Sequence, residues 1–191
     1  MCAQAKPARR TSLPPVVALT GFMAAGKSTV GRTLGSLLRW SSFDLDYEIE
    51  CRHQLRVREI FERHGEAHFR ELETEALRTL LESASGPTVI ALGGGTFVQL
   101  QNAELLRTFR AHVVFLESDV KHLLQRCLTA GARCAENPRP LARNPEAFFA
   151  LYAERLPSYR KAKVTVNTES KSAEQVAREI AAILKLTRSR H

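Results

Sequence analysis

Eight residues near the N-terminus carry the clearest chemical signal in the sequence. Residues 21–28 read GFMAAGKS and match the pattern GxxxxGK[ST] of a phosphate-binding loop. Backbone N–H groups of such a loop wrap phosphates, its lysine, Lys27, reaches the β and γ oxygens, and the hydroxyl of Ser28 can bind Mg²⁺. The residues that we expect to contact ATP are Gly21, Ala24, Ala25, Gly26, Lys27, Ser28 and Thr29.

Two carboxylates, Asp44 and Asp46, follow the first expected helix in a segment, residues 41–46, that we interpret as a short strand. On extended backbone, side chains two residues apart point to the same side, so both could face the phosphate loop. A carboxylate there can order the water shell of Mg²⁺ or accept a proton from an attacking hydroxyl. The local pattern leaves open that both are solvated acids at the end of a strand.

A second group of polar residues points to an acceptor. Arg70 and Glu73 lie three residues apart on an expected helix, where they could hold an anionic polyol or simply pair with each other. Gly93, Gly94 and Gly95 follow an expected buried strand, at the end of the strand where open α/β sheets bind ligands. The glycines therefore indicate either a tight turn or a wall of a substrate site.

These residues can act together only if the fold brings them to the same edge of a sheet. Short apolar runs alternate with segments of helical periodicity, which predicts a parallel sheet covered by helices. The expected strands are 16–19, 89–92, 112–116 and 163–166, and the expected helices are 28–39, 69–81, 119–128 and 172–184. Residues 129–145 contain one glycine and three prolines, which is typical of a long mobile loop.

Composition and charge narrow the function. The formal net charge is +8 over 191 residues, but residues 1–15 and 185–191 carry three positive charges each, and we expect both ends to be loose. We therefore expect no nucleic-acid partner. The four cysteines form no CxxC pair, and no apolar run is long enough to span a membrane, so we expect a cytoplasmic protein without a membrane partner. The guanine-reading NKxD motif of GTPases is absent from the sequence.

Six motifs, in this order, resemble the shikimate kinases: GFMAAGKSTVGR at 21–32, FDLD at 43–46, GEAHFRELE at 65–73, LGGG at 92–95, RPL at 139–141 and RLPSYRKA at 155–162. The resemblance extends from about residue 16 to 184. It implies an α/β, three-layer P-loop NTPase fold with a five-stranded parallel sheet, a substrate-binding region and a lid at about 127–145. Basic tails at 1–15 and 185–191 would flank this single domain.

The resemblance also implies roles for individual residues. Asp46 would bind hydroxyls of the acceptor and is a candidate base, and Asp44 would support the Mg²⁺ shell through water. Arg70 and Arg155 would grip the carboxylate of shikimate, with Glu73 orienting Arg70. Gly93, Gly94 and Gly95 would let the backbone approach the substrate ring. Lys27 and, with the lid, Arg139 would neutralise charge on the transferring phosphoryl group, and Arg126 would stack on adenine.

The expected reaction is phosphorylation of the 3-hydroxyl of shikimate by ATP with Mg²⁺, in a monomer. A kinase of another small hydroxy acid such as gluconate, or a weakened ATP-binding module, remains an alternative. Two departures from the family pattern bear on this. Ala24 stands where glycine is common, so a positive φ there would cost about 1 kcal/mol. The segment 127–138 is several residues longer than usual.

Overall fold

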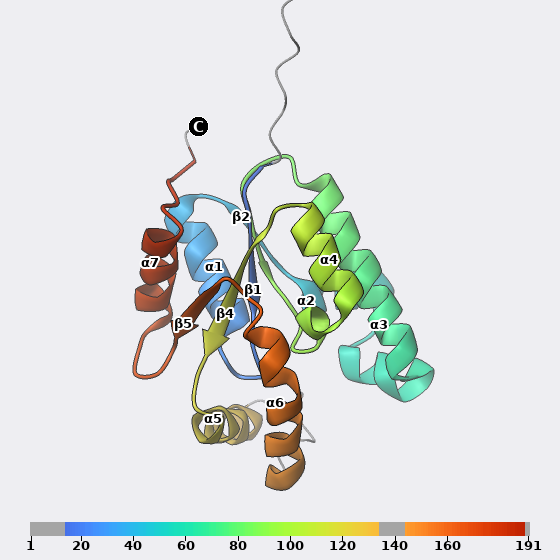
Figure 1. Cartoon of the computed structure of the whole chain (residues 1–191). Coiled ribbons are helices and arrows are strands. Elements are labelled where there is room, and N and C mark those ends of the chain that lie inside the picture. Colours follow the sequence, from blue (N-terminus) through green and yellow to red (C-terminus); the bar gives the residue numbers. More distant parts are fainter. Residues whose placement is uncertain (1–13, 134–143, 190–191) are drawn as a thin grey trace, which may run out of the picture.

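The computed structural model describes residues 14–133 and 144–189 of the 191-residue chain. Strands and helices alternate through the described residues (Figure 1). The strands are β1 (Val16–Thr20), β2 (Ser41–Asp44), β3 (Thr88–Ala91), β4 (His112–Glu117) and β5 (Val164–Asn167). The helices are α1 (Lys27–Leu38), α2 (Leu45–His53), α3 (Val57–Ser83), α4 (Leu100–Thr108), α5 (Val120–Arg133), α6 (Pro145–Tyr159) and α7 (Ala173–Ile183), with a 3₁₀ turn, η1 (Thr96–Val98).

The five strands form one parallel sheet, as the resemblance implies, and their order is β2-β3-β1-β4-β5. Helices α1 and α7 cover one face of the sheet, and α3 and α4 cover the other (Figure 1). Because all strands run the same way, every strand ends at the same edge. Helices α5 and α6 lie beyond that edge, where the segments after β1, β2 and β3 also emerge.

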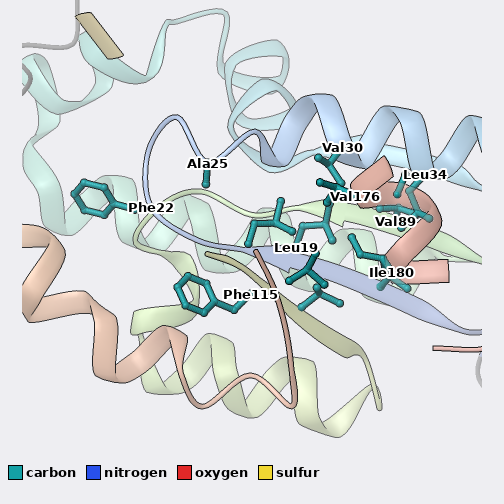
Figure 2. Close-up of a cluster of buried hydrophobic side chains, with 14 of the residues drawn as sticks. Leu19, Phe22, Ala25, Val30, Leu34, Val89, Phe115, Val176 and Ile180 are labelled. Carbon is teal, nitrogen blue, oxygen red and sulfur yellow. The ribbon is translucent and has the colours of Figure 1, made fainter. Parts of the chain in front are cut away.

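Two apolar cores, one on each face, hold the helices to the sheet. Side chains of β1 alternate between them: Val17 and Leu19 pack in the core under α1 and α7, and Val16 and Ala18 in the core under α3 and α4. Figure 2 shows the first core, in which Leu34 of α1 and Ile180 of α7 lie near Leu19. Burying each large aliphatic side chain contributes about 2 kcal/mol, so the start of α1 is firmly anchored to β1.

The segment that carries the two aspartates differs from the prediction. Strand β2 ends at Asp44, and Asp46 lies in the first turn of α2 rather than on extended backbone. The carboxylate of Asp44 accepts the backbone N–H groups of Asp46 and Tyr47 at 3.1 and 3.3 Å, so Asp44 caps the helix. The prediction of one strand through residue 46 was therefore wrong, because the cap ends it two residues earlier.

Helix α3, the longest helix at 27 residues, is broken at Gly65. The backbone there has φ 81° and ψ 173°, a conformation that only glycine adopts without strain. The break turns the second part of α3, which carries Arg70 and Glu73, along the sheet. Among the described helices, α3 included, none is both long and apolar enough to cross a membrane.

The predicted long loop begins later than expected. Residues 129–133 continue α5, and α6 begins at Pro145, where the side chain of Asn144 accepts the N–H of Ala147 and caps the helix. Residues 134–143 lie outside the described residues, and so does Arg139, which the resemblance places in a lid. The lid therefore stays a prediction.

The C-terminal segment corrects a second expectation. Residues 185–189 were expected to be loose, but they pack against the end of α1. The backbone N–H of Ser189 donates to the carbonyl of Leu38 at 3.0 Å, and the guanidinium of Arg188 donates to the carbonyl of Leu37 at 3.0 Å. The indole of Trp40 donates to the carbonyl of Thr187 at 3.2 Å. A cation at the C-terminus of a helix is favourable, so this segment caps α1.

Candidate active site

The phosphate loop connects β1 to α1 in a conformation that depends on glycine. Gly21 has φ 146° and Gly26, at the N-cap of α1, has φ 92°. The ammonium group of Lys27 donates to the carbonyls of Gly21 and Phe22 at 2.9 and 3.0 Å, which holds it over the loop. Phe22 is buried, and its ring contacts that of Phe148 on α6 edge to face at 5.0 Å. The loop is thus fixed at both ends and on one side.

Ala24 adopts the positive φ that the sequence analysis considered, with a value of 62°. The left-handed conformation brings a Cβ close to the following carbonyl oxygen and costs about 1 kcal/mol relative to glycine. The loop therefore keeps the path of a glycine-containing loop at the expense of some stability. The cost falls on the same backbone that would surround the phosphates.

The carboxylate of Asp46 has a strongly raised pKa. Burial and, after it, the negative charges of Asp44 and Glu73 raise its pKa from 3.8 to about 6, against an opposing effect of Lys27. Asp46 is thus ionised at neutral pH but close to its titration range. A carboxylate with that pKa can accept a proton from a hydroxyl that is losing it.

Arg70 is held on three sides. Its guanidinium donates to Glu73 at 2.9 Å and to Glu66 at 2.8 Å, and it lies 5.4 Å from the ring centre of Phe69. Burial alone would lower the pKa of Arg70, but the ion pairs with Glu73 and Glu66 outweigh burial and raise it. The guanidinium of Arg70 is therefore always charged and is held in one orientation.

Glu73 holds Arg70 in place and also binds the segment that follows the glycines. Its side chain is fully buried and accepts from three donors: Arg70, the hydroxyl of Thr96 and, at 2.7 Å, the amide of Gln99. Three donors offset the cost of burying a carboxylate. Glu73 thereby ties α3 to η1, the turn that follows the glycines.

Two glycines of the turn, Gly93 and Gly95, are packed tightly against the charged groups. A Cβ built on Gly93 would lie 2.5 Å from an oxygen of Glu73 and 2.8 Å from one of Asp46. On Gly95 it would lie 2.5 Å from Arg70 Nη1. These positions need glycine for space, which supports a site wall over an ordinary turn.

Gly94 connects the turn to two further parts of the site. A Cβ on Gly94 would lie 3.6 Å from Arg155 Nη1 and 3.9 Å from the backbone nitrogen of Met23 in the phosphate loop. Arg155 comes from α6, whose residue Tyr159 donates its hydroxyl to the carbonyl of Gly94 at 2.5 Å. Asp46, Arg70, Arg155 and the phosphate loop therefore surround one short turn.

Other predicted residues lie at the margin of this cluster. Ser28 and Thr29 are exposed at the start of α1, and Ala25 is buried beneath the loop. Arg126 is on α5, where it donates to the carbonyl of Thr168 at 3.4 Å, beside the connection from β5 to α7. Arg126 therefore lies near the sheet edge, and its hydrogen bond goes to Thr168 rather than to the acceptor residues.

Sequence reasoning missed Thr96, Gln99 and Tyr159 as parts of the site. Thr96 and Gln99 donate to Glu73, which lies 23 and 26 residues before them in the sequence. Tyr159 donates to the carbonyl of Gly94, which lies 65 residues before it. Tyr159 was visible in the motif RLPSYRKA, four residues after Arg155, but a tyrosine at that spacing signals packing as readily as a polar contact.

A parallel sheet with a phosphate loop after its first strand, and acceptor residues at the ends of the next two, defines an α/β P-loop kinase. Comparison with known proteins specifies the family. The family model described as "Shikimate kinase" matches residues 23–185. The chain belongs to the shikimate kinase family of enzymes.

The relatives agree over nearly the whole chain. The shikimate kinase of Geobacter sulfurreducens is 41% identical over 88% of this chain and 90% of its own length. The shikimate kinase of Moorella thermoacetica is 41% identical over 91% of this chain and 96% of its own length. The predictions of family and fold are therefore confirmed.

Solved structures give the same result. The Acinetobacter baumannii shikimate kinase in complex with shikimate superposes with a TM-score of 0.80 at 36% identity, covering 91% of this chain and 95% of its own. The Aquifex aeolicus shikimate kinase has a TM-score of 0.77 at 35% identity, covering 89% and 96%. A gluconokinase from Sinorhizobium meliloti, at 17% identity and a TM-score of 0.57, shares the fold.

Proposed function

We propose that this enzyme transfers the γ-phosphoryl group of ATP to the 3-hydroxyl of shikimate. The observation that carries the proposal is the convergence on residues 93–95. Asp46, Arg70 and Arg155 reach this turn from three different helices, and the backbone of the phosphate loop reaches it from a fourth side. An acceptor with both hydroxyls and a carboxylate suits such a mixed set of groups, and shikimate is the ligand named for the Acinetobacter baumannii relative.

The two arginines would bind the carboxylate of the acceptor and Asp46 a ring hydroxyl. A planar carboxylate is best held by guanidinium forks, and Arg70 is already oriented by Glu73 and Glu66. Binding at both ends would place the 3-hydroxyl beside the phosphate loop for in-line attack. Neutral sugars would lose the interaction with both arginines.

The hydroxyl oxygen then forms a bond to the γ-phosphorus as the bond from phosphorus to the β–γ bridging oxygen breaks, and ADP leaves. The proton of the hydroxyl passes to Asp46 or to the transferred phosphoryl group. Lys27 and the loop N–H groups stabilise the charge on the phosphates. Because the pKa of Asp46 is about 6, its carboxylate is ionised and ready at pH 7 to 8.

Mg²⁺ belongs to the proposal through the chemistry of its donors. The hydroxyl of Ser28 and the carboxylate of Asp44 are hard oxygen ligands of the kind that Mg²⁺ prefers. Among the described residues, no group of three or more His, Cys, Asp or Glu side chains could hold a metal, which suits an ion held mainly by phosphates and water. Bound Mg²⁺ would neutralise charge between the β and γ phosphates.

Further roles rest on the family resemblance. Arg126 would contact adenine, and Arg139 would close over the phosphates with the lid. We also propose a monomer that works in the cytoplasm without a nucleic-acid or membrane partner. Light scattering of the purified chain at micromolar concentration tests the first point, and a dimer would contradict it.

The proposed reaction is tested by ADP release from ATP and Mg²⁺, with shikimate, gluconate or no acceptor. We expect turnover with shikimate only. Arg70→Ala and Arg155→Ala should each lower kcat/KM for shikimate about 10- to 100-fold, because each loses charge-assisted hydrogen bonds, while KM for ATP stays within about twofold.

Arg58→Ala is the matched control for this test. Arg58 lies on the same helix as Arg70, but its side chain is 56% exposed and pairs with the exposed Glu62. Its loss should leave both KM values unchanged. Turnover with gluconate, or no turnover with any acceptor, would contradict the proposed substrate.

A further inference from the structure

Helix α6 contains a second polar residue at the acceptor site whose part in the reaction is unassigned. Tyr159 follows Arg155 by four residues, so both side chains lie on the same face of α6. The side chain of Tyr159 is completely buried. A buried phenol group needs partners for its hydroxyl, and the partners here are both parts of the proposed acceptor site.

The hydroxyl of Tyr159 joins these two parts. It donates to the carbonyl of Gly94 at 2.5 Å, and the guanidinium of Arg155, which lies beside the same glycine, opposes the rise in the pKa of this hydroxyl. A guanidinium can only donate, and the hydroxyl of Tyr159 already donates to Gly94, so the phenol oxygen faces Arg155 as an acceptor beside the glycine turn. Arg155 Nη1 also lies beside Gly94: a Cβ placed on this glycine would be 3.6 Å from that nitrogen.

The ring of Tyr159 is fixed by the core of the sheet. It stacks on Phe115 of β4, with ring centres 5.3 Å apart and planes 24° apart. Burial, its largest cause, raises the pKa of Tyr159 to about 12, so the hydroxyl keeps its proton at any pH at which the enzyme works. The hydroxyl of Tyr159 therefore stays protonated and is held in one position.

We propose that Tyr159 is a positioning residue for the acceptor. By holding the guanidinium of Arg155 against the glycine turn, it sets the angle at which Arg155 meets the carboxylate of the substrate. This inference rests on the proposed role of Arg155 as a ligand of that carboxylate. Without the hydroxyl, the arginine keeps its charge but loses the contact that orients it, so binding becomes weaker and less well aligned.

A double-mutant cycle tests the proposal, with kcat/KM for shikimate as the readout. Tyr159→Phe removes one oxygen and keeps the ring. We expect it to lower kcat/KM for shikimate about tenfold, the effect of one hydrogen bond to a charged group, and to leave KM for ATP within about twofold. In the Arg155→Ala background the same change should cost less than about twofold, because the group that it positions is gone.

Tyr152→Phe is the matched control. Tyr152 lies two turns earlier on α6 and donates to the carbonyl of Ser118 at 3.4 Å rather than to the glycine turn. It should leave kcat/KM for shikimate unchanged. A substrate carrying the carboxylate as a methyl ester gives an independent readout, because it should show the same kcat/KM with wild type and Tyr159→Phe.

Each outcome decides the matter. An equal loss with and without Arg155 would overturn the proposal, since Tyr159 would then act through Gly94 or through general stability. No loss in Tyr159→Phe would also overturn it. If Arg155→Ala itself has no effect, the proposed carboxylate site fails first, and that failure is distinguishable. Should Tyr159→Phe not fold cooperatively, Phe115→Leu keeps the hydroxyl but removes its stacking partner, and the proposal requires the same selective loss for shikimate.

Discussion

Asp46→Asn should make the protein more stable at neutral pH while it impairs the enzyme. The pKa of Asp46 is raised from 3.8 to about 6, chiefly by burial. A carboxyl whose pKa is higher in the folded state destabilises that state whenever it is ionised. The penalty is absent below pH 3.8, grows as pH rises, and is complete above pH 6.

The size of the penalty follows from the shift. Each pKa unit corresponds to about 1.4 kcal/mol, so the shift amounts to about 3 kcal/mol. About 2 kcal/mol of it develops between pH 4 and pH 8. The neutral amide of asparagine avoids this penalty, so the variant should gain about 2 kcal/mol over wild type across that range, or about 4 to 8 °C in Tm.

Urea unfolding of both proteins at pH 4, 5, 6, 7 and 8 measures the difference. Glu71→Gln, which removes an exposed carboxylate on α3, controls for the loss of one negative charge. We expect the difference in unfolding free energy between Asp46→Asn and wild type to rise through pH 6. A difference that does not change with pH, or one that falls, would refute the raised pKa of Asp46. In wild type, kcat/KM should fall as pH falls below about 6, where Asp46 takes up its proton.

Three further changes test other parts of the site. Lys27→Ala should reduce kcat by at least about 10²-fold with little change in shikimate affinity by calorimetry, and a fully active variant would contradict the mechanism. Ala24→Gly should raise the unfolding free energy by about 1 kcal/mol in denaturant titrations, because φ is 62° there, and a loss of stability would argue against the strain. Gly95→Ala should lower kcat/KM for shikimate about tenfold or more by displacing Arg70, whose guanidinium lies 2.5 Å from the new Cβ. Gly86→Ala is its control, since nothing lies within 4 Å of a Cβ there, and equal effects of the two glycine variants would refute the steric argument.

Much of the fold was predictable because its signals are local. The apolar runs of β1, β3, β4 and β5 are short and compact, and the phosphate loop fixes the order of strand, turn and helix by its glycines and Lys27. Helix α4 was missed because its nine residues carry only a weak periodicity around Leu105 and Leu106. The boundary at Asp44 was also missed, although an aspartate just before a helix is a known capping signal.

The sequence predicted which residues belong to the site better than it predicted how they are arranged. Asp46, Arg70 and Arg155 were recognised from motifs, but their convergence on one turn depends on tertiary packing. Nothing local to residue 73 indicates that Thr96 and Gln99 satisfy its carboxylate, because the partners come from another element. The packing of residues 185–189 on α1 was likewise hidden, since basic residues near a terminus usually remain solvated.

The two carboxylates beside Gly93 show how the site divides stability from function. Glu73 is fully buried yet accepts from Arg70, Thr96 and Gln99, so its charge is compensated and it holds the acceptor site together. The pKa of Asp46 rises because of burial and, after it, the negative charges of Asp44 and Glu73, with Lys27 as the opposing cation. Glu73 is thus engaged in orienting Arg70, whereas the raised pKa of Asp46 lets it take up a proton near neutral pH. Stability and activity therefore favour the same residue at position 73 and different residues at position 46.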